Sequence, residues 1–392
     1  MTTYASPPTE LLTPPDATAN IRLPRRESRQ VRVRDVLVGG NAPVSVQSMT
    51  TSDTENIPET MAQILKVANA GCQIVRVATP NREAAEAIKT IVKESPIPVV
   101  ADIHFNHQLA LIAADNGIDA LRINPGNLSD KAYIKEVVHK AQACKIPIRV
   151  GINAGSLEPV VKEKHPDNIV QALVESALLN VRLLEDEGFE DIVVSVKASD
   201  PMSMIAAYRE VSKRIPYALH LGVTEAGTLK RGLIKSSLGI GMLLMEGIGD
   251  TIRVSLTADS VEEVTAGLEI LRSVGLRQEG VDLISCPSCG RAELDLHSLA
   301  NQVEAMIQDI KLPVKVAVMG CFVNGPGEAE QADIGIAGGK NEFYIFRGTE
   351  RVDKVSPEGA IERFKNELDN FITENREMLE ARQQPSASIM LG

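Results

Sequence analysis

Between Val31 and about Gly275, short runs of β-branched residues alternate with longer amphipathic segments, and this rhythm constrains the fold more than any other feature. Segments such as Pro58–Ala70 repeat apolar residues at the spacing of a helix. Eight β-then-α units in about 250 residues match the size of a (β/α)8 barrel. The expected strands are Val44–Thr50, Ile74–Ala78, Pro98–Asp102, Ala120–Asn124, Pro147–Asn153, Asp191–Ser195, Ala218–Val223 and Thr251–Ser255.

The alternative is a doubly wound open sheet, but no glycine-rich phosphate-binding fingerprint follows an early strand. Gln30–Gly40 reads as a hairpin that would plug the bottom of the barrel. We therefore predict an α/β protein with a (β/α)8 TIM-type barrel at residues 29–276.

After Gly275 the rhythm changes, and a smaller α+β domain is expected at residues 285–376. Its expected strands are one that leads into Cys286, then Val314–Met319, Ile334–Ala337 and Glu342–Arg347, with a last helix from about Glu358 to Asn375. Residues 1–28 are expected to be a disordered N-terminal extension, because the first 20 are rich in proline and threonine and lack Lys and Arg. The polar residues 377–392 are expected to form a flexible tail.

Composition excludes several classes of protein. The 41 Lys and Arg residues against 52 Asp and Glu give a net charge of −11, which argues against broad nucleic-acid binding. No apolar run reaches the ~18 residues of a membrane span. Five cysteines without scaffold spacing indicate a reducing compartment, the cytoplasm, and Cys72 and Cys144 are expected to be buried apolar side chains.

Four expected strands carry an arginine between apolar residues: Arg76, Arg122, Arg149 and Arg253. Because strand residues alternate between faces, these arginines would point into the barrel while their neighbours face the helices. Internal carboxylates are one possible counter-charge. A barrel lumen is usually filled by Val, Ile and Leu, however, so the coincidence favours a bound anion. Lys197 adds a fifth cation, and guanidinium groups match phosphate oxygens, so a diphosphate is the expected ligand.

Other strand ends are polar as well. They hold Gln47, Ser48, Asp102, His104, Asn124, Asn153, His220, Thr224, Glu225 and Ser255. Asp102 and His104 share one face of a strand end at the barrel mouth. Glu225 follows the seventh strand, where it would serve as an acid and base or as a counter-charge.

The C-terminal domain carries three cysteines at metal-ligand spacing, Cys286, Cys289 and Cys321, followed by Glu328. No fourth cysteine completes the set, so one position would be weakly held or open to substrate. Three thiolates with a carboxylate would hold zinc, or a [4Fe-4S] cluster whose fourth iron takes an exchangeable oxygen from Glu328. The alternatives are therefore an iron–sulfur enzyme, an iron–sulfur sensor or carrier on a phosphate-binding barrel, and a pteroate-synthase-like transferase with a zinc lobe.

Together these residues resemble the IspG/GcpE family of 4-hydroxy-3-methylbut-2-enyl diphosphate synthases, in its short bacterial form. The matching motifs are Val46-Gln-Ser-Met-Thr50, Ala101-Asp-Ile-His-Phe105, Leu121-Arg-Ile-Asn-Pro-Gly-Asn127, Arg149-Val-Gly-Ile-Asn-Ala-Gly-Ser156, Arg253-Val-Ser255, Cys286-Pro-Ser-Cys289-Gly-Arg and Gly320-Cys-Phe-Val-Asn-Gly-Pro-Gly-Glu328. They cover about residues 30–375 in order; residues 1–28 are not part of the family pattern.

The resemblance implies a function in the non-mevalonate isoprenoid pathway: two-electron reductive ring opening of methylerythritol cyclodiphosphate with loss of water. It implies that Asp102, His104 and Glu225 lie near the carbon skeleton, with Glu225 as the proton-transfer group. The implied diphosphate ligands are Arg76, Arg122, Arg149, Asn153, Lys197, Arg253 and Ser255. The implied ligands of a [4Fe-4S] cluster are Cys286, Cys289, Cys321 and, until substrate arrives, Glu328.

The resemblance also implies partners. Electrons would come from flavodoxin or ferredoxin. The chain would form a homodimer in which the cluster domain of one subunit closes over the barrel of the other.

Overall fold

The computed structural model describes residues 23–104, 106–124, 131–289, 292, 295–321, 332–339 and 342–383. The chain divides into two compact units, Met1–Leu276 and Arg277–Gly392. Within the described residues, we find no helix with the length and apolar character needed to span a bilayer.

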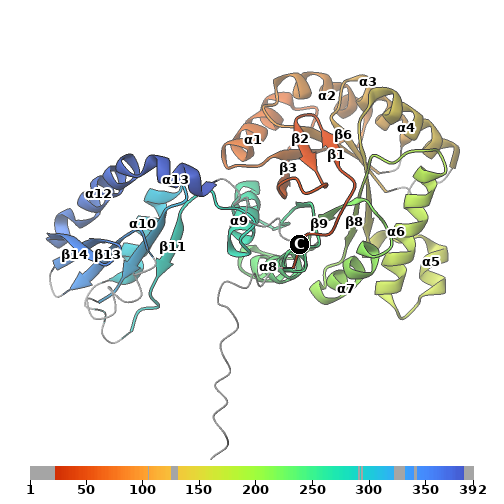
Figure 1. The fold of residues 1–392 in the computed structure, drawn as a ribbon. Coiled ribbons are helices and arrows are strands. Elements are labelled where there is room, and N and C mark those ends of the chain that lie inside the picture. Colours follow the sequence, from red (N-terminus) through yellow and green to blue (C-terminus); the bar gives the residue numbers. More distant parts are fainter. Residues whose placement is uncertain are drawn as a thin grey trace, which may run out of the picture. The chain divides into compact units, whose positions relative to one another are not determined.

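In the first unit, eight parallel strands close into a barrel in the order β10-β3-β4-β5-β6-β7-β8-β9, and helices surround them (Figure 1). The strands are β3 (Ser45–Met49), β4 (Ile74–Ala78), β5 (Val99–Ile103), β6 (Ala120–Ile123), β7 (Ile148–Asn153), β8 (Ile192–Lys197), β9 (Ala218–Leu221) and β10 (Thr251–Ile252). The predicted barrel is therefore confirmed. Since β10 ends at Ile252, Arg253 follows the strand, although its N–H still donates to Leu221 O at 2.9 Å.

The barrel helices are α1 (Ile57–Asn69), α2 (Arg82–Glu94), α3 (His107–Asp115), α4 (Lys131–Cys144), α5 (Pro159–Lys164), α6 (Ile169–Glu185), α7 (Pro201–Ser212), α8 (Leu229–Met245) and α9 (Ser260–Ser273). Several start at an Asn or Asp whose side chain accepts a backbone N–H of the first turn, as Asn81 does from Ala84 at 2.7 Å. Their apolar faces bury residues such as Ile64 and Ile88 against the strands. Cys72 is buried as expected, but the prediction for Cys144 was wrong: this last residue of α4 is exposed.

The N-terminal end of the barrel is closed by a hairpin of β1 (Val31–Val33) and β2 (Val36–Val38). Its valines Val31, Val33 and Val38 pack on residues near the beginnings of the barrel strands, among them Ile74 and Val100. The plug expected from Gln30–Gly40 is therefore present.

Residues 23–28, which we call the strap, also lie against the barrel. Leu23 N donates to Met245 O at 2.8 Å, and Arg26 donates to Ile215 O at 2.8 Å. Arg25 pairs at 3.0 Å with Asp250, a carboxylate that is 2% exposed. The prediction of disorder was wrong for this segment, because a buried carboxylate requires its cation; residues 1–22 lie outside the described residues.

The second unit is built on a five-stranded sheet in the order β11-β12-β13-β14-β15. Its strands are β11 (Asp282–Ser285), β12 (Lys315–Met319), β13 (Ile334–Gly339), β14 (Glu342–Arg347) and β15 (Glu350–Val355). Helices α10 (Leu296–Ile307) and α12 (Ala360–Glu374) supply Val303 and Phe364 to its core. Strand β15 was not expected, because this mostly exposed, charged edge strand lacks an apolar alternation.

The flexible tail expected from residue 377 was also wrong in part. Residues Arg376–Gln383 form α13, in which Leu379 is fully buried. Arg382 of this helix makes two hydrogen bonds to Asp333, at 2.7 and 3.0 Å. A buried leucine and a bidentate ion pair hold α13 in place; residues 384–392 lie outside the described residues.

Candidate active site

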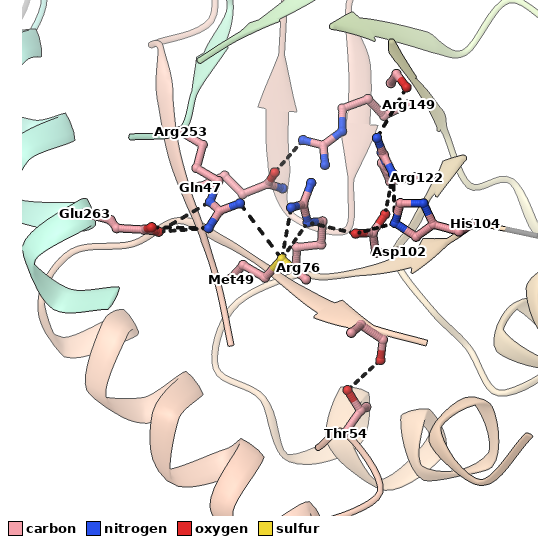
Figure 2. Close-up of polar contacts among 12 residues, drawn as sticks. Gln47, Met49, Thr54, Arg76, Asp102, His104, Arg122, Arg149, Arg253 and Glu263 are labelled. Atoms are coloured by element: carbon pink, nitrogen blue, oxygen red, sulfur yellow. Dashed lines mark hydrogen bonds and ion pairs between the residues drawn. The ribbon is translucent and has the colours of Figure 1, made fainter. Parts of the chain in front are cut away.

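Five cations gather inside the barrel. Arg76, Arg122, Arg149 and Lys197 come from β4, β6, β7 and β8, and Arg253 comes directly after β10. Arg122, Arg149 and Lys197 are 4%, 6% and 7% exposed, so their charges are removed from solvent. In Figure 2 the side chains of the four arginines turn toward the same region of the barrel. The sequence expectation that these arginines face inward agrees with this geometry.

Asp102 is the counter-charge for two of them. Its Oδ1 accepts from Arg122 at 3.0 Å, and its Oδ2 lies 3.5 Å from Arg76 Nε and 3.4 Å from His104 Nε2 (Figure 2). Burial would raise the pKa of Asp102, but Arg76, His104 and Arg122 outweigh it and lower that pKa well below its usual range. The carboxylate therefore stays charged, which suits it to orient arginines rather than to donate a proton.

Glu263 is the second buried carboxylate, and sequence reasoning missed it. It lies on α9, is 4% exposed, and accepts from Arg253 NH2 through both of its oxygens at 3.2 Å. Ser48 Oγ and Leu256 N also donate to it, at 3.0 and 2.9 Å. Acidic residues are common in the first turn of a helix because the positive end of the helix dipole stabilises them. A glutamate at this position therefore did not indicate a buried side chain.

Met49 lies between two of the arginines. Its Sδ accepts from Arg76 Nε and NH2 at 3.1 and 2.9 Å, and Arg253 NH1 lies 3.9 Å away (Figure 2). A thioether is a weak acceptor without charge. It therefore orients the two guanidinium groups without cancelling their attraction for an anion.

Arg122 reaches its position because Gly151 leaves room for it. A Cβ at Gly151 would lie 2.4 Å from Arg122 Nε, and Arg122 NH2 donates to Gly151 O at 3.3 Å. With its amide oxygen turned toward the guanidinium, Asn153 accepts from the same NH2 at 3.2 Å. Arg122 and Arg149 are register partners on β6 and β7, so two like charges lie side by side.

Arg149 is only partly satisfied. It donates through NH1 to Gln47, while its Nε and NH2 have no partner among the residues that the structure describes. Its neighbour His220 is fully buried with both ring nitrogens unpartnered, again within the described part of the chain. Burial, Arg76 and Arg122 lower the pKa of Arg149, and burial, Arg149 and Lys197 lower that of His220. The two share a small cavity of about 30 Å³ next to the hairpin.

Five cations thus face two buried carboxylates, Asp102 and Glu263. Unpaired buried charge costs several kcal/mol per ion, so the excess of positive charge has to be offset by a ligand or by loss of a proton. The arrangement can bind a multiply charged anion through forked guanidinium donors.

The remaining predicted residues lie around the mouth. Asn124 is buried and donates to Ser156 at 3.0 Å, and Ser255 is half-buried just beyond β10. Glu225 is exposed on the loop after β9, with a left-handed φ of 52° that non-glycine residues rarely adopt. Such strain persists where the surroundings impose it, often at functional loops.

The second unit brings two of the cysteines to one edge of its sheet. Cys286 and Cys321 come just after the parallel neighbours β11 and β12, and Cys286 Sγ accepts from Gly320 N at 3.1 Å. A hydrogen bond from a backbone N–H to sulfur is typical of the thiolate ligands of iron–sulfur clusters, so these residues fit such a group. Cys289 is exposed. The described residues contain no gathered set of three His, Cys, Asp or Glu side chains, and the predicted Glu328 lies outside them.

Residues 28–268 match the GcpE TIM-barrel domain, and residues 282–370 match the GcpE protein C-terminal domain. The chain belongs to the GcpE family.

Curated relatives within this family carry one name. A protein of Clostridium acetobutylicum named 4-hydroxy-3-methylbut-2-en-1-yl diphosphate synthase (flavodoxin) is 53% identical over 347 residues, 88% of this chain and 99% of that protein. A Geobacter sulfurreducens protein of the same name is 50% identical over 350 residues, 89% and 99% of the two chains. Among solved structures, a dihydropteroate synthase of Yersinia pestis is similar with a TM-score of 0.46 and 9% identity, over 62% of this chain and 96% of that one, a likeness that carries no functional argument.

Proposed function

We propose that the chain is a 4-hydroxy-3-methylbut-2-enyl diphosphate synthase of the non-mevalonate isoprenoid pathway, an iron–sulfur oxidoreductase. Its substrate is methylerythritol cyclodiphosphate and its electron donor is flavodoxin, which relatives carry in their name, or a ferredoxin. The observation that carries the proposal is the excess of five cations, three of them buried and two partly buried, over two buried carboxylates inside the barrel of a GcpE-family chain. A cyclic diphosphate supplies the missing negative charge.

The barrel residues bind and orient this substrate. Arg149 has two unpartnered guanidinium nitrogens among the described residues, and Lys197 is buried among four arginines, so these two form the centre of the proposed diphosphate site. Asp102 and Glu263 hold the guanidinium groups of their arginines in fixed directions. A guanidinium group that is already oriented loses less conformational entropy when the diphosphate binds. The other proposed diphosphate ligands are Arg76, Arg122, Asn153, Arg253 and Ser255.

The reaction consumes two electrons and two protons. One carbon–oxygen bond to the diphosphate breaks, and one hydroxyl leaves as water. We assign proton transfer to Glu225, whose exposed, left-handed position at the mouth lets a carboxyl group exchange protons with solvent. Asp102 and His104 are assigned to the carbon skeleton side of the substrate; because Asp102 remains ionised, it acts there through charge.

The thiolates of Cys286, Cys289 and Cys321 are proposed to hold a [4Fe-4S] cluster, with Glu328 as a replaceable fourth ligand. When bound, such a cluster supplies one-electron transfer and a Lewis-acidic iron. Three reduced thiols require a reducing compartment, and we therefore place the enzyme in the cytoplasm. We further propose a homodimer in which the cluster domain of one subunit completes the barrel site of the other.

One experiment tests the proposed function. The protein is purified without oxygen, its iron, sulfide and zinc are counted, and methylerythritol cyclodiphosphate is added with a strong reductant or with reduced flavodoxin. We expect about four irons and four sulfides per chain and formation of the linear diphosphate. Stoichiometric zinc without iron contradicts the proposal, and a full cluster without turnover by any donor indicates a sensor instead. Mixing an Arg149→Ala chain with a Cys321→Ser chain tests the shared site, because hybrid dimers should recover one intact site.

A further inference from the structure

Lys197 differs from the other buried cations in its lack of a partner. It is the last residue of β8 and is 7% exposed. Among the residues that the structure describes, none lies within hydrogen-bond or ion-pair distance of its ammonium group. Gly222 makes room for the side chain, since a Cβ there would lie 3.0 Å from Nζ. The lysine is thus built into the interior rather than extended to solvent.

The charges around Lys197 are almost all of its own sign. Cations act on it from four other elements of the barrel: Arg76 on β4, Arg122 on β6, Arg149 on β7 and Arg253 beyond β10. The two buried carboxylates are already engaged, Asp102 on β5 by Arg76 and Arg122, and Glu263 on α9 by Arg253. The remaining titratable groups on the walls are the fully buried His220 on β9, the half-buried His104 after β5 and the exposed Glu225 after β9.

Of these five cations, lysine alone can lose its proton near neutral pH. Arginine stays charged in proteins. Burial, together with Arg253 and Arg122, lowers the pKa of Arg76 to about 10 although Asp102 raises it, and burial also lowers the pKa of Arg149. Burial, then Arg76 and Arg149, lower the pKa of Lys197 well below its ordinary range. Loss of the proton from the amine of Lys197 therefore removes one of the unpaired buried charges and its free-energy cost.

We infer that Lys197 is a neutral amine in the anion-free barrel and takes up one proton when a polyanion binds there. The anion supplies the counter-charge that the interior lacks, so the ammonium form becomes the stable one. The identity of that anion as the cyclic diphosphate rests on the proposed function; the coupling itself rests on the arrangement of charges.

The inference has a definite sign. At pH values between the lysine pKa of the empty barrel and that of the occupied barrel, anion binding takes up a proton. The affinity for the anion therefore falls by up to about tenfold for each unit of rising pH. A cyclic diphosphate has one strongly acidic hydroxyl on each phosphorus and does not titrate in this range. The pH dependence of its binding therefore belongs to the protein.

Calorimetry of the anaerobically purified holoprotein measures this coupling. Trimetaphosphate and methylerythritol cyclodiphosphate are each titrated at pH 8.5 in two buffers with different heats of ionisation, because the difference in observed heat counts the protons taken up. At this pH an ordinary histidine, with a pKa of about 6.5, contributes little. We expect close to one proton per site for the wild type.

Three variants assign the proton to its group. Lys197→Met should take up none and bind roughly 10- to 100-fold more weakly, the effect of losing one charged hydrogen-bond donor. Lys197→Arg should bind with no proton uptake, because its charge is permanent. Lys230→Met, an exposed lysine on α8, is the matched control and should behave as the wild type.

Wild-type binding without proton uptake at pH 7.5, 8.5 and 9.5 overturns the inference, and this result does not depend on any variant folding. Uptake that is unchanged in Lys197→Met also overturns it. If trimetaphosphate binds with proton uptake while the cyclic diphosphate does not bind, the coupling is supported and the proposed substrate is wrong. If the cyclic diphosphate is turned over but binds without uptake, the proposed function stands and the coupling fails.

Discussion

At the residue scale, the site depends on groups that leave space or supply counter-charge. Gly151 is the clearest case of space, since Arg122 lies where its Cβ would be. We expect Gly151→Ala to push the guanidinium away from Asp102 and to weaken binding of the cyclic diphosphate roughly tenfold, measured by calorimetry. Gly155→Ala is the matched control, because a Cβ there meets no described atom within 4 Å. Equal affinities of the two variants would contradict this role.

Glu263 is the clearest case of counter-charge. Glu263→Gln keeps the shape of the side chain but leaves Arg253 buried without its partner. Removal of one partner from a buried ion pair costs about 3–5 kcal/mol of unfolding free energy, which urea unfolding of the two proteins measures. Glu262→Gln changes the exposed neighbour in the same helical turn and should cost less than about 0.5 kcal/mol. A similar loss for both variants would mean that Glu263 acts only through the helix.

The stabilisation by Asp102 has a predictable pH dependence. Because its folded pKa is lowered, its contribution is complete above its unfolded pKa of about 3.9 and is lost as the pH falls through the folded value. The difference in unfolding free energy between the wild type and Asp102→Asn should therefore be constant from pH 8 to 5 and shrink only below about pH 4. A difference that already declines between pH 7 and 5 would show that another group titrates.

The two kinds of residue were not equally readable from the sequence. Arginines between apolar strand residues interrupt the continuous apolar run expected of a barrel strand, and this made them visible. Glu263 and Met49 are residues of ordinary type in ordinary positions. Glu263 follows Arg253 by only ten residues, but its type in a first helical turn gave no sign of burial. Met49 reaches Arg253 only through the closure of the barrel, which pairs β10 with β3. Contacts where the first and last strands of the ring meet join residues about 200 positions apart, as Met49 and Arg253 are. No local sequence pattern encodes such a pair.

At the scale of elements, the strap is held by charge. It was expected to be disordered because the sequence does not reveal that Asp250 is buried beneath its arginines. A chain that begins at Arg29 loses the contacts of Leu23, Arg25 and Arg26 and leaves Asp250 without a cation. We expect its barrel to unfold with about 3 kcal/mol less free energy than a chain that begins at Leu23, measured by urea unfolding. Equal stability of the two chains would mean that the strap contributes nothing.

At the scale of the whole molecule, a substitution in the anion site of the barrel should leave the cluster of the other unit in place. Arg149→Ala should keep the brown colour of the cluster while binding of the cyclic diphosphate falls at least tenfold. Cys321→Ser should lose cluster and activity together, since three thiolates are proposed to hold the cluster. Iron content and calorimetry of both variants measure this. Normal substrate binding by Arg149→Ala would contradict the anion site.

The division into units was readable from the change in rhythm after Gly275, and so was the barrel. Two strands of the second unit, Ile334–Gly339 and Glu342–Arg347, were readable from their apolar runs. Strand β15 and helix α13 were not, because both are charged elements fixed by partners elsewhere, such as Asp333 for Arg382. The apolar pattern of the sequence thus predicts the elements of the interior. The peripheral elements depend on strand pairing and ion pairs with distant residues, which the pattern does not reveal.

The pairing of Arg25 with Asp250 has a consequence for synthesis of the chain. The two residues are 225 positions apart, so a ribosome that adds about 5–20 residues per second has released Arg25 for on the order of 10 to 45 s before Asp250 emerges. During that interval β3 also lacks β10, its neighbour in the closed ring. The nascent barrel therefore carries an open sheet edge that chaperones and other chains can reach, and the last strand to be made both closes the ring and locks the first segment in place.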